Sequence, residues 1–133
     1  MAYKDKGSQD FKNKTFLSSF EFAVQGLRTV FKEERNMRKH CRVAVLVILL
    51  GFFFHLSISE WLWTLLVVFL VIVMEIINTT VENIVDLVTN YHFHPLAKKA
   101  KDMAAGAVLF TALLAVVVGS FIFLPKIWLF IVH

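Results

Sequence analysis

Three long apolar runs dominate the pattern of hydrophobic and polar positions along the chain. They cover residues 43–59, 61–88 and 103–124. Each run approaches or exceeds the ~20 residues that an α-helix needs to cross the hydrocarbon core of a bilayer. The pattern therefore predicts three transmembrane helices, joined by a short turn near residue 60 and by a polar loop over residues 89–102.

The segment before the first run has a different pattern. In residues 15–40, apolar side chains recur every three or four positions with polar residues between them, which is typical of an amphipathic helix. Beside a membrane, such a helix lies in the interface or packs against the helix bundle. We expect residues 15–40 to form this surface helix and the polar residues 1–14 to be a flexible tail. The recurring apolar residues are Phe16, Phe20, Val24, Leu27 and Phe31.

The composition supports a membrane protein. Hydrophobic residues make up 58% of the 133 positions and charged residues 18%, whereas soluble domains are roughly 45–50% apolar. The first 42 residues lack the apolar core of a cleavable signal peptide, so we expect the N-terminus to remain in the mature protein. The single Cys41 excludes an internal disulfide framework. The fold class that follows is an all-α integral membrane protein, with residues 1–133 forming one membrane domain.

The net charge of +4 reflects topology better than it reflects a nucleic-acid partner. Ten of the 14 Lys and Arg residues precede residue 43, and three more, Lys98, Lys99 and Lys101, lie in the loop between the second and third runs. Because positive residues concentrate on the cytoplasmic side of membrane proteins, we expect a cytoplasmic N-terminus and an external C-terminus in the cell membrane.

The second apolar run is interrupted by Glu75, Asn78, Glu82 and Asp86. At about 100° per residue, Asn78, Glu82 and Asp86 fall within an arc of about 80° around Glu75, so all four share one helix face. A charged group inside a span costs roughly 2.5–3.5 kcal/mol on insertion scales. Contact between helices explains Asp86, at the cytoplasmic end. For the other three, the pattern favours a functional site.

The depth of these residues suggests separate roles. At ~1.5 Å per residue, Glu75 lies about 21 Å from Trp61 along the helix, still inside the inner leaflet of a core ~30 Å thick. Glu82, about 10 Å further on, falls near the level of the headgroups.

Further charged residues flank the cytoplasmic end of this stripe. Carboxylates near a lysine at a water–lipid boundary suit a Mg²⁺ ion that holds phosphates, although the same groups can form a proton or cation relay. The sequence contains no P-loop, no protein-kinase motifs and no GxGxxG fingerprint. The flanking residues are Glu33, Glu34, Lys101 and Asp102.

Three spans enclose little protein interior. The third begins with the small residues "AAGA" at 104–107, which allow helix backbones to approach closely. A single chain cannot surround buried carboxylates on all sides, so we expect a homo-oligomer whose sites form between subunits.

Three motifs in order resemble those of the prokaryotic diacylglycerol kinase family of integral membrane lipid kinases. They are "ERNMRKH" at 34–40, "EIINTTVENIVD" at 75–86 and "HPLAKKAKDMAAGAVL" at 94–109. The resemblance spans residues 15–124, and the motifs are closest to the Gram-positive branch, whose members resemble undecaprenol kinases. It implies a homotrimer with active sites shared between subunits.

The resemblance also implies roles for individual residues. Glu75 would be the catalytic base that takes the proton of the lipid alcohol. Glu34 and Glu82 would hold the Mg²⁺ of Mg-ATP. Glu34 is preferred over Glu33 because its distance from "GLR" at 26–28 fits the family. The residues implied in ATP binding are Glu34, Asn78, Glu82, Lys101 and Asp102.

The leading hypothesis is an ATP-dependent kinase that phosphorylates undecaprenol in the membrane. Diacylglycerol is the alternative substrate. A small proton or cation relay is the competing function of another class, and a membrane assembly factor without chemistry is a third.

Overall fold

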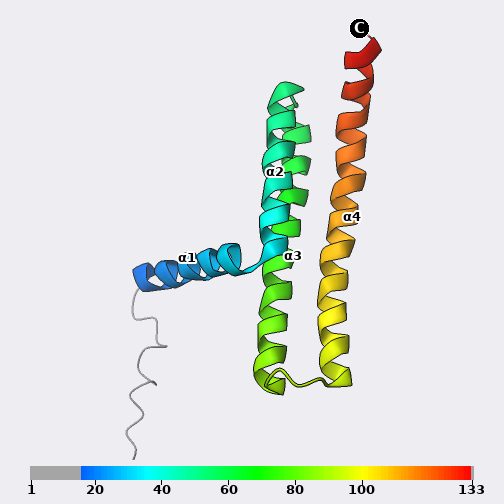
Figure 1. Cartoon of the computed structure of the whole chain (residues 1–133). Helices are drawn as coiled ribbons and strands as arrows, with labels where there is room; N and C mark the ends of the chain where they lie inside the picture. Colours follow the sequence, from blue (N-terminus) through cyan, green and yellow to red (C-terminus); the bar gives the residue numbers. More distant parts are fainter. Residues whose placement is uncertain (1–15, 133) are drawn as a thin grey trace, which may run out of the picture. The chain divides into compact units, whose positions relative to one another are not determined.

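The computed structural model describes residues 16–132 and contains four α-helices (Figure 1). In this range the chain has no β-strand, so the all-α prediction is confirmed. The chain divides into two compact units, the first ending at Glu33 and the second starting at Glu34. The tail expected over residues 1–14, and Thr15, lie outside the described residues. The helices are α1 (Phe16–Glu33), α2 (Arg35–Phe53), α3 (Ile58–Thr89) and α4 (Pro95–Val132).

Helix α1 makes up the described part of the first unit, and none of its residues is buried. It ends at Glu33, so the segment predicted as one helix over 15–40 is divided at Glu34, whose φ of −90° and ψ of 118° are extended. Residues 32–36, "KEERN", are all polar, so no apolar face continues across this point. The apolar pattern resumes on α2, whose first buried residue is Met37.

The second unit consists of three antiparallel helices in chain order (Figure 1). A capping box starts α3: the Glu60 backbone N–H donates to the Ser57 hydroxyl, and the Ser57 backbone N–H donates to the Glu60 carboxylate. Asn90 and Tyr91 end α3 in the left-handed conformation, and Pro95 begins α4. These local signals define the two turns that hold the three helices antiparallel.

A close approach joins α2 to the start of α3. A Cβ atom on Gly51 would lie 2.7 Å from the Trp61 ring, so only glycine leaves room for this ring. Trp61 also packs against Phe52, with ring centroids 4.9 Å apart. Trp61 therefore contributes to helix packing, whereas Trp63 is largely exposed.

The packing face of α3 changes character along its length. In the first half of α3 this face is apolar apart from Thr64, and in the second half it carries Glu75 and Asn78. The buried positions recur at helical spacing, so the polar stripe continues the apolar packing face. Ion pairs fasten α3 to α4 at both ends, through Lys126 to Glu60 and through Lys101 to Asp86. The buried positions are Thr64, Val67, Val71, Glu75, Asn78 and Thr79.

Two helices, α3 and α4, are long and apolar enough to cross a membrane. Only 6% of the most apolar 18 residues of α4 are buried, so this helix leaves most of its apolar surface uncovered. Helix α4 continues through Pro125 to Val132, beyond the predicted end at residue 124. Helix α2 is not among the apolar candidates, because its first half is basic and its apolar run is short; its span remains a prediction.

Candidate active site

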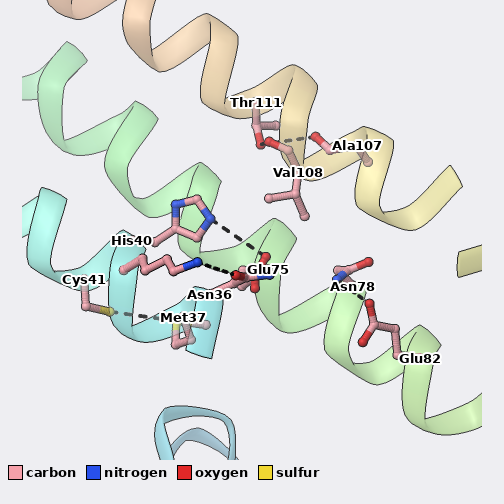
Figure 2. Close-up of polar contacts among 11 residues, drawn as sticks. Asn36, Met37, His40, Cys41, Glu75, Asn78, Glu82, Ala107, Val108 and Thr111 are labelled. Atoms are coloured by element: carbon pink, nitrogen blue, oxygen red, sulfur yellow. Dashed lines mark hydrogen bonds and ion pairs between the residues drawn. The ribbon is translucent and has the colours of Figure 1, made fainter. Parts of the chain in front are cut away.

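Glu75 lies at the centre of the candidate site (Figure 2). Although it is a carboxylic acid, it is only 2% exposed. Its Oε2 lies 3.9 Å from Nε2 of His40, which comes from α2. Val67 and Val71 precede it on the same face of α3, and Asn78 follows it. A potential base is therefore placed where an apolar helix face becomes polar.

Two further carboxylates act on Glu75 through their charges. Glu34 is the residue before α2, where its side chain makes no capping hydrogen bond, and Glu82 lies two turns further along α3. Both repel a negative charge on Glu75, whereas a positive charge on His40 attracts it. The fold thus brings Glu34, Glu75 and Glu82 into one electrostatic environment, although Glu34 is 41 positions away from Glu75 in sequence.

Asn78 connects the buried and the accessible parts of the stripe. Its Nδ2 donates a hydrogen bond of 3.1 Å to Oε1 of Glu82 (Figure 2). Its Oδ1 is buried and has no hydrogen-bond partner within the described residues. A buried polar atom without a partner is costly, so this oxygen is suited to accept a donor or a cation that the chain itself does not supply.

Lys101 and Asp102 face different partners. Nζ of Lys101 on α4 lies 2.5 Å from Oδ1 of Asp86 on α3. Asp102 instead pairs with Lys98, one turn earlier on the same helix, and the Asp102 side chain is 61% exposed. The structure therefore agrees with helix-to-helix contact as the role of Asp86. The two predicted nucleotide-contacting residues do not converge on one point in this chain.

The predicted metal ligands do not form a closed cage. Among residues 16–132, no three His, Cys, Asp or Glu side chains gather closely enough to hold a metal ion. The available oxygens still fit Mg²⁺, which is commonly bound through one or two carboxylates and completed by phosphate and water. Glu34, Glu82 and the unpartnered Oδ1 of Asn78 provide hard oxygen donors of this kind.

An apolar cavity of about 300 Å³ lies between α2, α3 and α4. His40, the partner of Glu75, is part of its wall. Thr64 also lines it, and its buried hydroxyl has no hydrogen-bond partner within the described residues. The remaining wall is formed mainly by small apolar residues: Val43, Ala44, Val47, Val67, Val68, Val71, Ala112, Ala115, Val116, Val118, Gly119 and Phe123.

Sequence reasoning assigned no role to His40. The feature of the sequence that could have identified His40 is its spacing: Met37 lies three positions before it and Ala44 four positions after it, and both are buried on α2. This spacing places His40 on the inner face of the helix, but only when α2 is known to begin at Arg35.

Comparison with known proteins places the chain in a family. A sequence model of the prokaryotic diacylglycerol kinases matches residues 21–123. The undecaprenol kinase of Bacillus subtilis is 42% identical over 122 residues, which are 90% of this chain and 98% of that protein. The diacylglycerol kinase of Synechocystis sp. is 40% identical over 84% of this chain and 63% of that protein.

A third relative is more distant. The diacylglycerol kinase of Helicobacter pylori is 38% identical over 72% of this chain and 74% of that protein. The family match covers the polar stripe of α3, the inner face of α2 and the first 29 residues of α4. This chain therefore belongs to the prokaryotic diacylglycerol kinase family.

Proposed function

We propose that this protein is an ATP-dependent lipid kinase that transfers the γ-phosphate to undecaprenol in the membrane. The observation that carries the proposal is the buried Glu75 carboxylate, whose partner His40 lines an apolar cavity. A base in this position suits a substrate whose hydroxyl must react while its hydrocarbon part stays in the membrane. The similarity to an undecaprenol kinase over 98% of that relative supports this choice of lipid.

The proposed chemistry assigns one proton transfer to Glu75. Its carboxylate accepts the proton of the lipid hydroxyl as the hydroxyl oxygen forms a bond to the γ-phosphorus of ATP. The bond between the γ-phosphorus and the β–γ bridging oxygen breaks, and ADP leaves. Most of the acceleration in phosphoryl transfer comes from positioning and charge stabilisation, so the fixed place of Glu75 on α3 matters as much as its basicity.

The remaining site residues bind the nucleotide in this proposal. Glu34 and Glu82 hold the Mg²⁺ of Mg-ATP, which neutralises charge on the phosphates. Lys101 provides a positive charge for the phosphates, and Asp102 and Asn78 complete the contacts to ATP. The acceptor oxygens of Glu34 and Glu82 and the unpartnered Oδ1 of Asn78 support this assignment.

The proposed arrangement in the membrane has three spans. Helix α2 crosses together with α3 and α4, and α1 lies in the cytoplasmic interface with its Phe and Leu side chains in the lipid. The N-terminus and the site face the cytoplasm, and the C-terminus is external. The oligomer in this proposal is the homotrimer that the resemblance implies, in which neighbouring subunits complete the active sites; the largely uncovered surface of α4 leaves room for such neighbours.

Diacylglycerol is the second candidate substrate. The relatives from Synechocystis sp. and Helicobacter pylori are named diacylglycerol kinases, and both share more than a third of their aligned residues with this chain. A proton or cation relay is less well supported, because the buried face of α3 outward of Glu75 carries Val71, Val67 and a single polar residue, Thr64.

The test is a phosphorylation assay with two lipids. Purified protein in detergent micelles receives Mg-ATP labelled in the γ-phosphate and either undecaprenol or diacylglycerol. We expect label in both lipids and a higher kcat/KM for undecaprenol. The matched control is acetylated undecaprenol, which has the same chain without a free hydroxyl and should take up no label. Absence of label in both alcohols would refute the kinase, and a higher kcat/KM for diacylglycerol would reverse the substrate.

A further inference from the structure

His40 is the residue of α2 that reaches Glu75. Its Nε2 lies 3.9 Å from Oε2 of the carboxylate, and Figure 2 shows its ring directed from α2 toward α3. The Glu75 side chain is 3% exposed and that of His40 is 28% exposed, so the contact lies at the edge of the buried region.

The packing of α2 determines the place of this ring. Met37, three residues before His40, is fully buried, and Ala44, four residues after it, is buried as well. The Cys41 thiol also contacts the Met37 sulfur at 3.8 Å. Because residues three and four positions apart share a helix face, these neighbours hold the His40 backbone toward α3. Its position follows from packing that does not itself involve charge.

His40 also differs in kind from the other charged groups that act on Glu75. These are Glu34, the residue before α2, and Glu82 on α3, and both carry negative charge. From α4, Figure 2 draws Ala107, Val108 and Thr111, and the Thr111 hydroxyl donates to the Ala107 and Val108 carbonyls of its own helix. Of the charged groups that act on Glu75, His40 is therefore the one with an N–H to offer its carboxylate.

We propose that His40 is the positioning residue for Glu75: its Nε2 holds Oε2, so that Oε1 is presented to the lipid alcohol. The inference rests on the proposed kinase function and adds a residue to it. Since His40 also lines the apolar cavity between α2, α3 and α4, the hydroxyl of a lipid in that cavity meets Glu75 beside the His40 ring.

The distance of 3.9 Å is longer than a direct hydrogen bond of ~2.7–3.2 Å. Hydrogen bonds among catalytic groups are often long without substrate and shorten in the complex. A neutral imidazole with its proton on Nε2 and a charged imidazolium both donate to a carboxylate, so holding Oε2 does not require His40 to be charged. Fixing one oxygen restricts rotation of the carboxyl group and leaves a single orientation for proton transfer.

The experiment compares His40→Phe with His40→Gln. Phenylalanine keeps a ring in the cavity without an N–H, and glutamine restores a donor at about the reach of Nε2. We expect His40→Phe to lower kcat for undecaprenol about tenfold, with KM for ATP changed by less than about twofold. We expect His40→Gln to recover most of kcat. The matched control is Arg42→Phe, an exposed position on the next part of the same helix, which should behave as wild type.

A double-mutant cycle tests whether His40 acts through Glu75. In a Glu75→Gln background, His40→Phe should cause no further loss of kcat, because the carboxylate it positions is absent. Equal loss in both backgrounds would overturn the proposal, as would wild-type kcat in His40→Phe. If His40→Phe does not fold, His40→Gln is compared with His40→Asn, whose shorter amide should lose kcat; equal kcat in the two would also refute it. A wild-type protein inactive on both lipids would instead refute the kinase function.

Discussion

At the scale of single residues, the site depends on a carboxylate kept away from water. A charge inside a membrane span is unfavourable by roughly 2.5–3.5 kcal/mol on insertion scales. Glu75 is 2% exposed, and among the described residues its ion-pair partner is His40, at 3.9 Å. Burying this carboxylate is unfavourable for folding, which favours a functional role for it. Substitution of Glu75 should therefore separate an effect on the chemical step from an effect on ATP binding.

We expect Glu75→Gln to lower kcat by about 100- to 10,000-fold, the usual contribution of a general base. KM for ATP should change by less than about twofold, because glutamine preserves the shape of the side chain. Steady-state kinetics with both substrates varied will separate the two parameters. The control is Glu21→Gln, the same change at an exposed position of α1. A kcat within twofold of wild type would remove Glu75 from the role of base.

Adjacent glutamates provide a matched test of metal binding. We expect Glu34→Gln to raise the Mg²⁺ concentration for half-maximal activity by about tenfold, because one oxygen ligand loses its charge. Glu33→Gln, at the last residue of α1, should leave the Mg²⁺ dependence unchanged. Activity measured at fixed ATP over a Mg²⁺ titration decides between them. Equal shifts in both variants would indicate a general effect of surface charge.

At the scale of elements, α3 and α4 are joined by the ion pair between Lys101 and Asp86, whose side chains are 34% and 27% exposed. Partly exposed ion pairs contribute about 0–1 kcal/mol to the free energy of unfolding. The value of this pair lies in fixing the register of the two long helices near the turn that joins them, where the candidate site residues of α4 lie.

Asp86→Asn should therefore lower Tm by no more than about 4 °C. It should not raise KM for ATP, because Lys101 keeps its charge and is released toward the nucleotide. Thermal unfolding in detergent and ATP kinetics give the two values. Lys98→Gln, which removes the more exposed pair with Asp102, should change Tm by less than about 1 °C. A clear rise in KM for ATP in Asp86→Asn would show that Asp86 positions Lys101 for binding.

The elements also show what sequence could predict. Helical arithmetic placed Glu75, Asn78 and Glu82 on one face, and α3 has this face. The break at Glu34 was not predicted, because Lys, Glu and Arg are good helix formers and a polar run of five residues does not by itself mark a helix end. Without that break the inner face of α2 is undefined, so the contact of His40 with Glu75 depends on tertiary structure. The pair of Lys101 with Asp86 likewise depends on the packing of α4 on α3, whereas Asp102 pairs with Lys98 one turn earlier on α4.

At the scale of the whole molecule, the chain is a membrane protein with two candidate spans and a large uncovered apolar surface. The number of subunits could not be predicted from residue patterns, because small residues such as those at 104–107 permit close packing without fixing its symmetry. Asp102 is 61% exposed and pairs with Lys98 of its own helix; in the proposed homotrimer it would be available to the site of a neighbouring subunit.

We expect Glu75→Gln and Asp102→Asn to complement each other. Each variant alone should be nearly inactive, whereas co-expressed subunits carrying different affinity tags should regain activity, because a mixed oligomer contains sites with both native residues. Activity of the doubly purified mixed oligomer is the measurement. If mixed oligomers form but remain inactive, Glu75 and Asp102 act within one subunit, and the shared site must be assigned to other residues.

The continuity of α3 has a consequence for which lipids can react. From the capping box at Ser57 to Glu75 there are 18 helical steps, a distance of about 27 Å. Inserting one residue would rotate everything after it by about 100°, whereas four would nearly restore the face and move Glu75 by about 6 Å. In the proposed membrane arrangement, the number of residues between the start of α3 and Glu75 therefore sets the depth of the Glu75 carboxylate in the bilayer. Only a lipid whose hydroxyl reaches that depth can react, whatever side chains recognise the rest of the substrate.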